Sequence, residues 1–141
     1  MSFEIRNISI NDYHKNYFEL LQQLTDSPKI SFEMFQEIVG KIKENIYVME
    51  DIEAQKIIAS GTLFIEQKLI RNGGKVGHME DIVVDKNYRN QKLGKKIVSF
   101  LIEEAKKRNC YKIIGDCSDY VLSFYNQLGF EKKANQIAIY F

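Results

Sequence analysis

The stretch from Gly77 to Lys96 constrains the fold most, because it joins an apolar strand to an amphipathic helix through a polar loop. The apolar residues Ile82 to Val84 lead into the loop Arg89 to Gly94, and a helical pattern of apolar residues begins at Leu93. The first N–H groups of a helix have no partner inside it, so this unit can present them to an anionic ligand. The segment therefore predicts a strand–loop–helix crossover with a phosphate site at the start of the helix.

Two carboxylates, Glu80 and Asp81, stand just before this apolar strand. Neighbouring residues of a strand point to opposite faces, so both side chains can share one face only if a bulge intervenes. A phosphate cradle beside an acidic pair suggests an enzyme that holds a phosphorylated cofactor next to a cationic or amine substrate. On the residues alone, ordinary surface charges at a strand end are the alternative.

Composition narrows the class of protein. The 141 residues are 45% hydrophobic and 28% charged, which predicts one globular domain over residues 1–141. Twenty Lys and Arg balance nineteen Asp and Glu, which argues against nucleic-acid binding through bulk charge. We see no signal-peptide pattern, membrane-spanning run, disulfide framework or metal-ligand cluster. We therefore expect a cytoplasmic protein with no metal and no nucleic-acid or membrane partner.

The remaining pattern predicts an α/β protein, with a central mixed sheet and helices on both faces. Strands are expected at 3–8, 46–49, 57–65, 75–84 and 111–117, with closing strands at 130–133 and 136–141. Helices are expected at 10–24, with Asn11 as its cap, from Ser31 onward, at 93–108 and at 120–128. Asn72-Gly73-Gly74 is a hairpin signal, and the crossover from Ile82 to Cys117 should make its two strands parallel neighbours.

Several blocks resemble those of a known family. Arg89-Asn90-Gln91-Lys92-Leu93-Gly94 resembles the Arg/Gln-x-x-Gly-x-Gly/Ala signature of the GNAT acyltransferase superfamily, and SFYNQLGF at 123–130 resembles its F-Y-x-x-x-G-F segment. Within the superfamily, GHMEDIVV at 77–84 and CYKIIGDC at 110–117 resemble blocks of the branch that acetylates glucosamine 6-phosphate. The resemblance spans essentially the whole chain. It implies the GNAT fold and direct transfer of acetyl from acetyl-CoA to the 2-amino group of D-glucosamine 6-phosphate, on the path to UDP-N-acetylglucosamine. It also implies a homodimer whose sites lie partly across the interface.

The resemblance implies a binding site for acetyl-CoA, the co-substrate. The backbone of the strand residues would pair with the pantetheine arm, and the N–H groups of the loop would hold the pyrophosphate. The residues implied are Ile82, Val83, Val84, Arg89, Asn90, Gln91, Lys92, Leu93, Gly94, Lys95, Val121 and Tyr125. Lys92 stands where the pattern has glycine, and a positive φ there costs a lysine about 1 kcal/mol or more.

The resemblance also implies the acceptor site. Three carboxylates would surround the amino sugar, while Lys68 and Arg71 would meet its phosphate. The full set is Thr25, Lys68, Arg71, Glu80, Asp81, Ile82, Asp116 and Tyr140. Tyr140 stands where some relatives have an arginine.

The catalytic residues implied are Tyr125, Asp116 and Glu80. Tyr125 would give a proton to the departing thiolate, and Asp116 would position the amine. Glu80 or a water would take the ammonium proton. Without the resemblance, Tyr125 is an ordinary core aromatic. Two other functions stay open: a GNAT reaction on another small amine, such as a polyamine or protein amine, and a non-catalytic acetyl-CoA-binding module.

Overall fold

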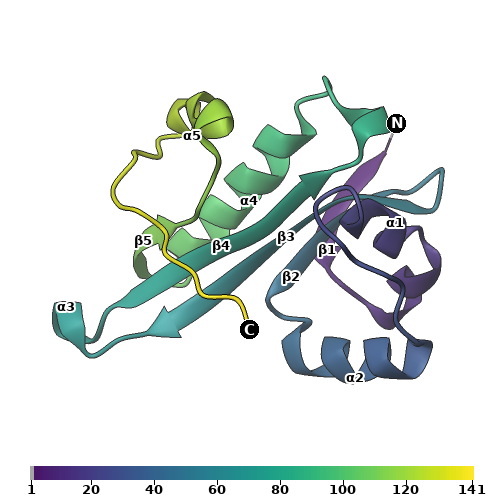
Figure 1. Ribbon diagram of the computed structural model, residues 1–141, viewed down its shortest axis with the longest axis horizontal. Coiled ribbons are helices and arrows are strands. Elements are labelled where there is room, and N and C mark those ends of the chain that lie inside the picture. Colours follow the sequence, from purple (N-terminus) through teal and green to yellow (C-terminus); the bar gives the residue numbers. More distant parts are fainter. Residues whose placement is uncertain (1) are drawn as a thin grey trace.

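The computed structural model describes residues 2–141 and contains a five-stranded sheet in the order β1-β2-β3-β4-β5. The strands are β1 (Phe3–Asn7), β2 (Ile46–Asp51), β3 (Lys56–Gln67), β4 (Lys75–Val84) and β5 (Cys110–Ile114). Neighbours from β1 to β4 are antiparallel, and β5 lies parallel to β4. The mixed sheet and the parallel crossover are therefore as the sequence predicts (Figure 1).

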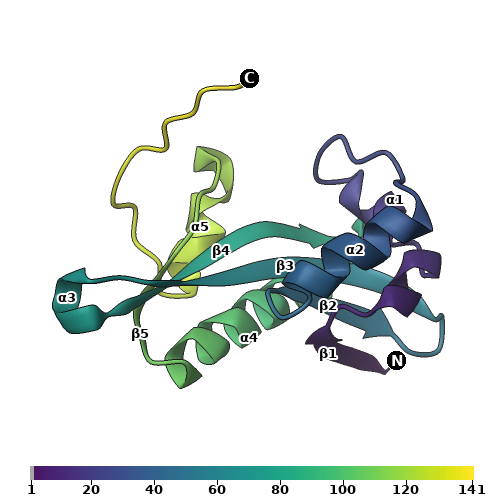
Figure 2. The ribbon, with the colours of Figure 1, turned by 90° about the horizontal axis from the view of Figure 1, so that it is seen from below.

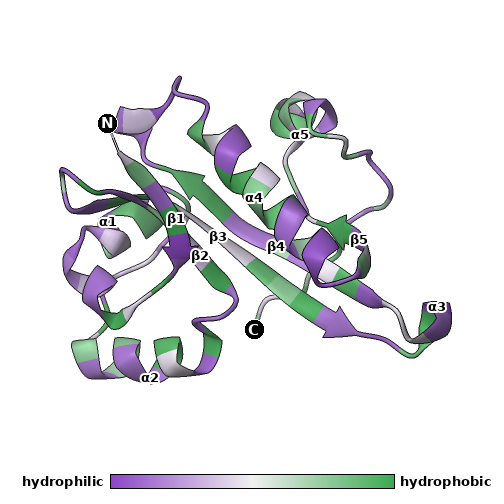
Figure 3. Cartoon of the chain, turned by 180° about the vertical axis from the view of Figure 1, so that it is seen from behind, coloured by the Kyte–Doolittle hydropathy of each residue, from purple (hydrophilic) through white to green (hydrophobic). Residues whose placement is uncertain are grey.

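Helices lie on both faces of the sheet (Figure 2). The long helix α4 (Leu93–Lys107) covers one face, and α5 (Leu122–Gln127) packs Phe124 and Tyr125 against the same core. The opposite face carries the 3₁₀ helix η1 (Ile10–His14), α1 (Tyr17–Leu21) and α2 (Phe32–Ile42). Hydrophobic and hydrophilic residues alternate around α2 and α4 (Figure 3), as expected for helices that cover a sheet. Within residues 2–141, the structure has no helix both long and apolar enough to cross a membrane.

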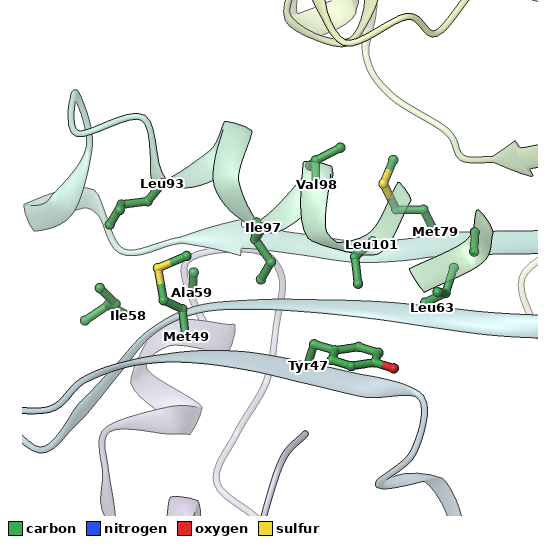
Figure 4. Packing of buried hydrophobic residues seen from close by; sticks show 11 residues of the cluster. Tyr47, Met49, Ile58, Ala59, Leu63, Met79, Leu93, Ile97, Val98 and Leu101 are labelled. Carbon is green, nitrogen blue, oxygen red and sulfur yellow. The ribbon is translucent and has the colours of Figure 1, made fainter. Parts of the chain in front are cut away.

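Two apolar clusters hold these layers together. Ile97 and Leu101 of α4 are fully buried and lie over Leu63 and Met79 of the sheet (Figure 4). On the other face, residues of α1 and α2 pack against Val48, which is also fully buried. The sheet is thus fixed from both sides, and this rigid frame positions the site described below.

One helix over residues 10–24 is a wrong prediction. The chain instead forms η1 and α1, separated at Asn16, whose φ is 60°. The cap is Ser9 rather than Asn11: the Ser9 hydroxyl accepts from the Asn11 N–H. The cause of the break is tertiary, because Arg6 donates two 2.8 Å hydrogen bonds to the fully buried Asp12 and holds the first turn against the sheet. The second helix is confirmed, with Ser31 as its cap.

The two closing strands at 130–133 and 136–141 are also wrong. Residues from Phe130 to Phe141 form no strand in this chain and extend away from the sheet face (Figure 2). Alternating apolar residues favour a strand, but a strand also needs a neighbour to satisfy its backbone groups, and the described chain supplies none here. Tyr140 and Ile137 are consequently more than 90% exposed.

The remaining connections position the ends of the sheet. β3 and β4 form the predicted hairpin, with Gln67 opposite Lys75, but a longer loop containing the short helix α3 (Ile70–Gly73) replaces a tight turn. The expected strand 111–117 ends early, at Ile114. Short 3₁₀ helices η2 (Lys86–Tyr88) and η3 (Asp119–Val121) precede α4 and α5.

Candidate active site

A bulge in β4 sets the geometry of the site. Thr62 of β3 faces Glu80 and Ser60 faces Val83, so Asp81 and Ile82 together face only Gly61. Asp81 takes a φ of 53°, in the left-handed region that side chains rarely adopt. A Cβ at position 61 would lie 2.8 Å from the Ile82 Cδ1 atom, so glycine lets the strands approach at this point. The bulge that both carboxylates require in order to share a face is therefore present.

The same region opens the sheet between β4 and β5. The two strands pair only as far as His78, which faces Ile114. Beyond this point, no strand of residues 2–141 pairs with β4 on that side. Residues Ile82 to Val84 therefore lie along a free strand edge, which an extended amide chain can join through backbone hydrogen bonds.

The loop before α4 supplies a second polar surface. Asn90 and Lys92 both have positive φ, 68° and 60°, which confirms the conformation expected at position 92. Lys92 is the residue before α4 and makes no capping hydrogen bond, and Leu93 anchors the helix start by being almost fully buried. The Lys92 and Lys95 side chains line a shallow hollow of about 570 Å³ beside Ile5 and Phe100. Within residues 2–141, no side chain caps the start of α4, so its first N–H groups can bind an anion.

A small pocket lies between α1 and the bulge. Its volume is about 220 Å³, and we call it the α1–β4 pocket. Thr25 and Asp81, both predicted to contact the acceptor, line this pocket together. The complete lining is Tyr17, Leu21, Leu24, Thr25, Ser27, Ile46, Ser60, Thr62 and Asp81. The structure thus joins the loop after α1 to the acidic pair of β4.

The three predicted carboxylates act on one another. Partial burial raises the pKa of Glu80, and the negative charges of Asp116 and Asp81 raise it further. Asp116 follows the end of β5 and accepts a 2.8 Å hydrogen bond from the Gln136 side-chain amide. Such a concentration of negative charge favours a cationic ligand, and a raised pKa makes Glu80 a stronger proton acceptor.

Tyr125 fits both roles considered for it, a core aromatic and a proton donor. Its ring makes edge contacts with Phe124 and Phe130, at centroid distances of 5.0 and 5.7 Å, so it is part of the core. Burial raises the pKa of its phenol, with a further contribution from Cys117, so the hydroxyl stays protonated near neutral pH. Val121 lies just before α5 and is half-buried.

Lys68, Arg71 and Tyr140 are among the six predicted acceptor residues that do not line the α1–β4 pocket of a single chain. Lys68 pairs with Glu66 at 3.3 Å, and the Arg71 guanidinium lies 5.4 Å from the centre of the Tyr111 ring. Both cations belong to the hairpin loop at the opposite end of β4 from the loop that precedes α4 (Figure 1). Tyr140 is 94% exposed at the end of the extended C-terminal segment.

Four hydroxyl residues that line the pocket were not predicted from the sequence: Tyr17, Ser27, Ser60 and Thr62. Two of them, Tyr17 and Ser60, form a buried contact. Tyr17 matches the apolar spacing of its helix, which hid its polar end, and Ser60 lies in an otherwise apolar strand. Their oxygen atoms are 3.1 Å apart, although the residues are 43 positions apart in the sequence. The only available signal was a lone serine between Ala59 and Gly61 in a buried strand.

A bulged β4, its separation from β5 and an uncapped loop leading into a long helix form a site that fits an extended amide chain with an anionic group. The chain matches the model of the acetyltransferase (GNAT) family over residues 6–130 and belongs to that family. It is 45% identical to glucosamine 6-phosphate N-acetyltransferase 1 of Dictyostelium discoideum, over 96% of this chain and 88% of that protein. It is 41% identical to glucosamine 6-phosphate N-acetyltransferase of Arabidopsis thaliana, over 99% of this chain and 97% of that protein.

Solved structures agree with this assignment. The crystal structure of glucosamine-6-phosphate N-acetyltransferase from Arabidopsis thaliana matches with a TM-score of 0.96 and 40% identity, covering 100% of this chain and 99% of that one. A Trypanosoma brucei acetyltransferase matches with a TM-score of 0.93 and 33% identity, covering 99% of this chain and 100% of that one. The GNAT fold expected from the sequence is therefore confirmed.

Proposed function

We propose that this chain transfers the acetyl group of acetyl-CoA to the 2-amino group of D-glucosamine 6-phosphate, forming N-acetylglucosamine 6-phosphate for UDP-N-acetylglucosamine synthesis. The observation that carries the proposal is the gathering of Glu80, Asp81 and Asp116, with the first two on one sheet face through the bulge. Relatives that match over nearly the whole chain bear the name of this activity. A cationic amine and several sugar hydroxyls are the groups that such carboxylates recognise.

The residues of the free edge and the loop fit the parts of acetyl-CoA. Ile82 to Val84 offer backbone groups for the amides of the pantetheine arm, since β5 no longer pairs with them. Asn90 to Lys95 offer N–H groups at the start of α4 for the pyrophosphate. Arg89 and Val121 flank these two surfaces, Arg89 at the end of η2 and Val121 at the start of α5.

The acidic residues and the tyrosine supply the proton chemistry. Asp116 orients the amine, and Glu80 or a water bonded to it removes the ammonium proton, which its raised pKa favours. The nitrogen then forms a bond to the acetyl carbonyl carbon, the carbon–sulfur bond breaks, and the nitrogen loses a second proton to solvent, from which Tyr125 regains its own. A backbone N–H of the bulged strand stabilises the oxyanion, and Tyr125 protonates the departing thiolate. With both substrates held together, the transfer is direct.

We further propose that the chain is a homodimer whose acceptor sites are shared. The C-terminal segment ends in Ile139, Tyr140 and Phe141, all more than 80% exposed. The segment extends away from the sheet (Figure 2), and Phe64 of β3 and Ile114 of β5 are also exposed. Apolar exposure of this kind supports burial against a second copy. Lys68, Arg71 and Tyr140 would then complete the partner's pocket, whose lining within residues 2–141 of one chain holds no cation for the sugar phosphate.

Mixing two inactive variants tests the shared site. Asp116→Asn and Arg71→Ala damage different halves of the acceptor site. Refolding them together creates dimers in which one site is built only from intact residues, so activity should return to a fraction of the wild-type value. Mixtures as inactive as the separate variants would refute the shared site. Sedimentation of the wild type gives the oligomeric state independently.

Steady-state release of CoA thiol from acetyl-CoA tests the function itself. The acceptors are glucosamine 6-phosphate, glucosamine, spermidine and a peptide amine. We expect efficient turnover only with the phosphosugar. Turnover with another amine would keep the GNAT chemistry and discard the substrate. Binding of acetyl-CoA without any turnover would favour a non-catalytic module. Asp116→Asn serves as the control, because it should lose turnover while still binding acetyl-CoA.

A further inference from the structure

Tyr17 of α1 and Ser60 of β3 bring two buried hydroxyl groups together on the wall of the α1–β4 pocket. Their oxygen atoms lie 3.1 Å apart, and the residues are only 5% and 3% exposed. Asp81 and Thr25 line the same small pocket. The transfer chemistry described above uses neither hydroxyl, so this pair is a polar feature of the site without an assigned role.

The Tyr17–Ser60 pair has one more hydroxyl proton than its mutual hydrogen bond uses. Two hydroxyls carry two protons, and the bond between Tyr17 and Ser60 uses one of them. Among the described residues, neither hydroxyl has a second hydrogen-bond partner. A buried O–H without an acceptor costs about 1–3 kcal/mol. The pocket is the space that both residues line, so an oxygen atom of its occupant can take the second proton.

The surrounding fold holds the Tyr17 hydroxyl in place. The left-handed Asn16 breaks the helix and turns Tyr17 onto the sheet, where the ring packs against Phe18 and Phe35. Burial raises the pKa of the Tyr17 phenol, and the negative charges of Asp12 and Asp81 oppose its ionisation further. The phenol therefore remains a hydrogen-bond donor throughout the neutral range.

We propose that Tyr17 and Ser60 contact the acceptor and donate a hydrogen bond to a ring hydroxyl of the bound amino sugar. This assignment rests on the proposed function and extends it to substrate selection. A preformed buried donor increases the affinity for an acceptor substrate that carries a hydroxyl at that place. It lowers the affinity for one that lacks the hydroxyl, because the donor is then left unpaired. The pair accordingly selects polyhydroxylated amines over alkyl amines such as polyamines.

The test compares wild type, Tyr17→Phe and Ser60→Ala with glucosamine 6-phosphate and with its 3-deoxy and 4-deoxy forms. We expect Tyr17→Phe to raise the KM for the parent phosphosugar about tenfold, the size of one hydrogen bond. The KM for acetyl-CoA should not change. With the deoxy form that lacks the contacted hydroxyl, wild type and variant should have the same KM.

Tyr13→Phe is the matched control, since the Tyr13 hydroxyl donates to the Ile30 carbonyl at 2.7 Å and does not line the pocket. Unfolding curves for all three variants separate kinetic effects from loss of fold. The assignment is overturned if Tyr17→Phe and wild type have the same KM for glucosamine 6-phosphate. It is also overturned if Tyr17→Phe raises the KM by the same factor for glucosamine 6-phosphate and for both deoxy forms. A wild type that does not turn over the phosphosugar overturns the proposed function, and this assignment with it.

Discussion

Glu80 and Asp81 are adjacent in β4, yet both side chains lie on the sheet face that α1 covers. Glu80 pairs with Thr62, which lines the α1–β4 pocket, and Asp81 lines that pocket directly. The bulge opposite Gly61 makes this possible, because it shifts the alternation of β4 by one residue. One irregularity thus concentrates the negative charge of the site beside the strand edge that β5 leaves free.

The pKa of Glu80 should fall when a neighbouring charge is removed. Partial burial and the charges of Asp116 and Asp81 raise it above its ordinary value of 4.5, so Asp116→Asn should lower it. Carboxyl ¹³C NMR titration measures this without requiring activity. Asp119→Asn is the control, because Asp119 pairs instead with Lys132 and does not contribute to the Glu80 shift. An unchanged Glu80 titration in Asp116→Asn would contradict the proposed cluster.

The raised pKa of Glu80 predicts how activity and stability each change with pH. A base must be ionised, so kcat/KM should fall with decreasing pH through a pKa above 4.5. Glu80→Gln should remove this acidic limb, whereas a limb that survives would assign the proton to another acceptor. Because the folded state holds the Glu80 proton more tightly, this group's contribution to stability declines as pH rises from 4.5 through the folded pKa.

Tyr125→Phe should slow the chemical step without weakening acetyl-CoA binding. The variant keeps the edge contacts of the ring with Phe124 and Phe130 and removes only the acidic hydroxyl. Loss of a general acid lowers kcat about a hundredfold or more. Single-turnover kinetics and calorimetry with acetyl-CoA separate the two effects. Tyr120→Phe, at an 86% exposed position, should leave both unchanged. Equal losses of binding and kcat in Tyr125→Phe would refute the acid role.

Lys92→Gly should stabilise the fold, because glycine adopts the observed φ of 60° without steric cost. We expect a gain of about 1 kcal/mol, measured by urea denaturation. Lys92→Ala separates the two roles of the residue, since alanine keeps the strained backbone and loses the ammonium group. If both variants weaken acetyl-CoA binding at low salt, the ammonium attracts the phosphates. A destabilised glycine variant would show that the backbone of Lys92 is not strained.

The ion pairs of Arg6 with Asp12 and Glu50 should contribute more to the free energy of unfolding than ion pairs on the surface. Arg6 donates to the fully buried Asp12 at 2.8 Å and to Glu50 at 2.6 Å. Asp12→Ala leaves the guanidinium partly unpaired and removes the carboxylate that caps η1, so unfolding free energy should fall by about 3 kcal/mol. Glu103→Ala, from an exposed pair with Lys106, should cost less than about 1 kcal/mol. Similar losses in the two variants would contradict this account.

The sequence predicts those features that depend on local pattern. The strand–loop–helix unit and the β3–β4 hairpin follow from residue types close together in the chain. The positive φ at Lys92 was expected from the resemblance, because the family pattern has glycine there. The break at Asn16 does not follow from local pattern, because Arg6 binds Asp12 from within the sheet, where Arg6 also binds Glu50, 44 positions away in the sequence. The bulge depends on the register between two strands, and the contact of Tyr17 with Ser60 on packing across the sheet. The closing strands failed because apolar alternation does not reveal where the pairing partner lies.

The most direct test of the central claim is to identify the product. Acetyl-CoA labelled with ¹³C at the acetyl carbonyl is mixed with glucosamine 6-phosphate and the protein, and the reaction is followed by NMR. We predict that the label moves from the thioester to an amide carbon on the 2-amino nitrogen, with one CoA thiol released for each amide formed. Label on a sugar oxygen, or thiol release without an amide signal, would contradict it.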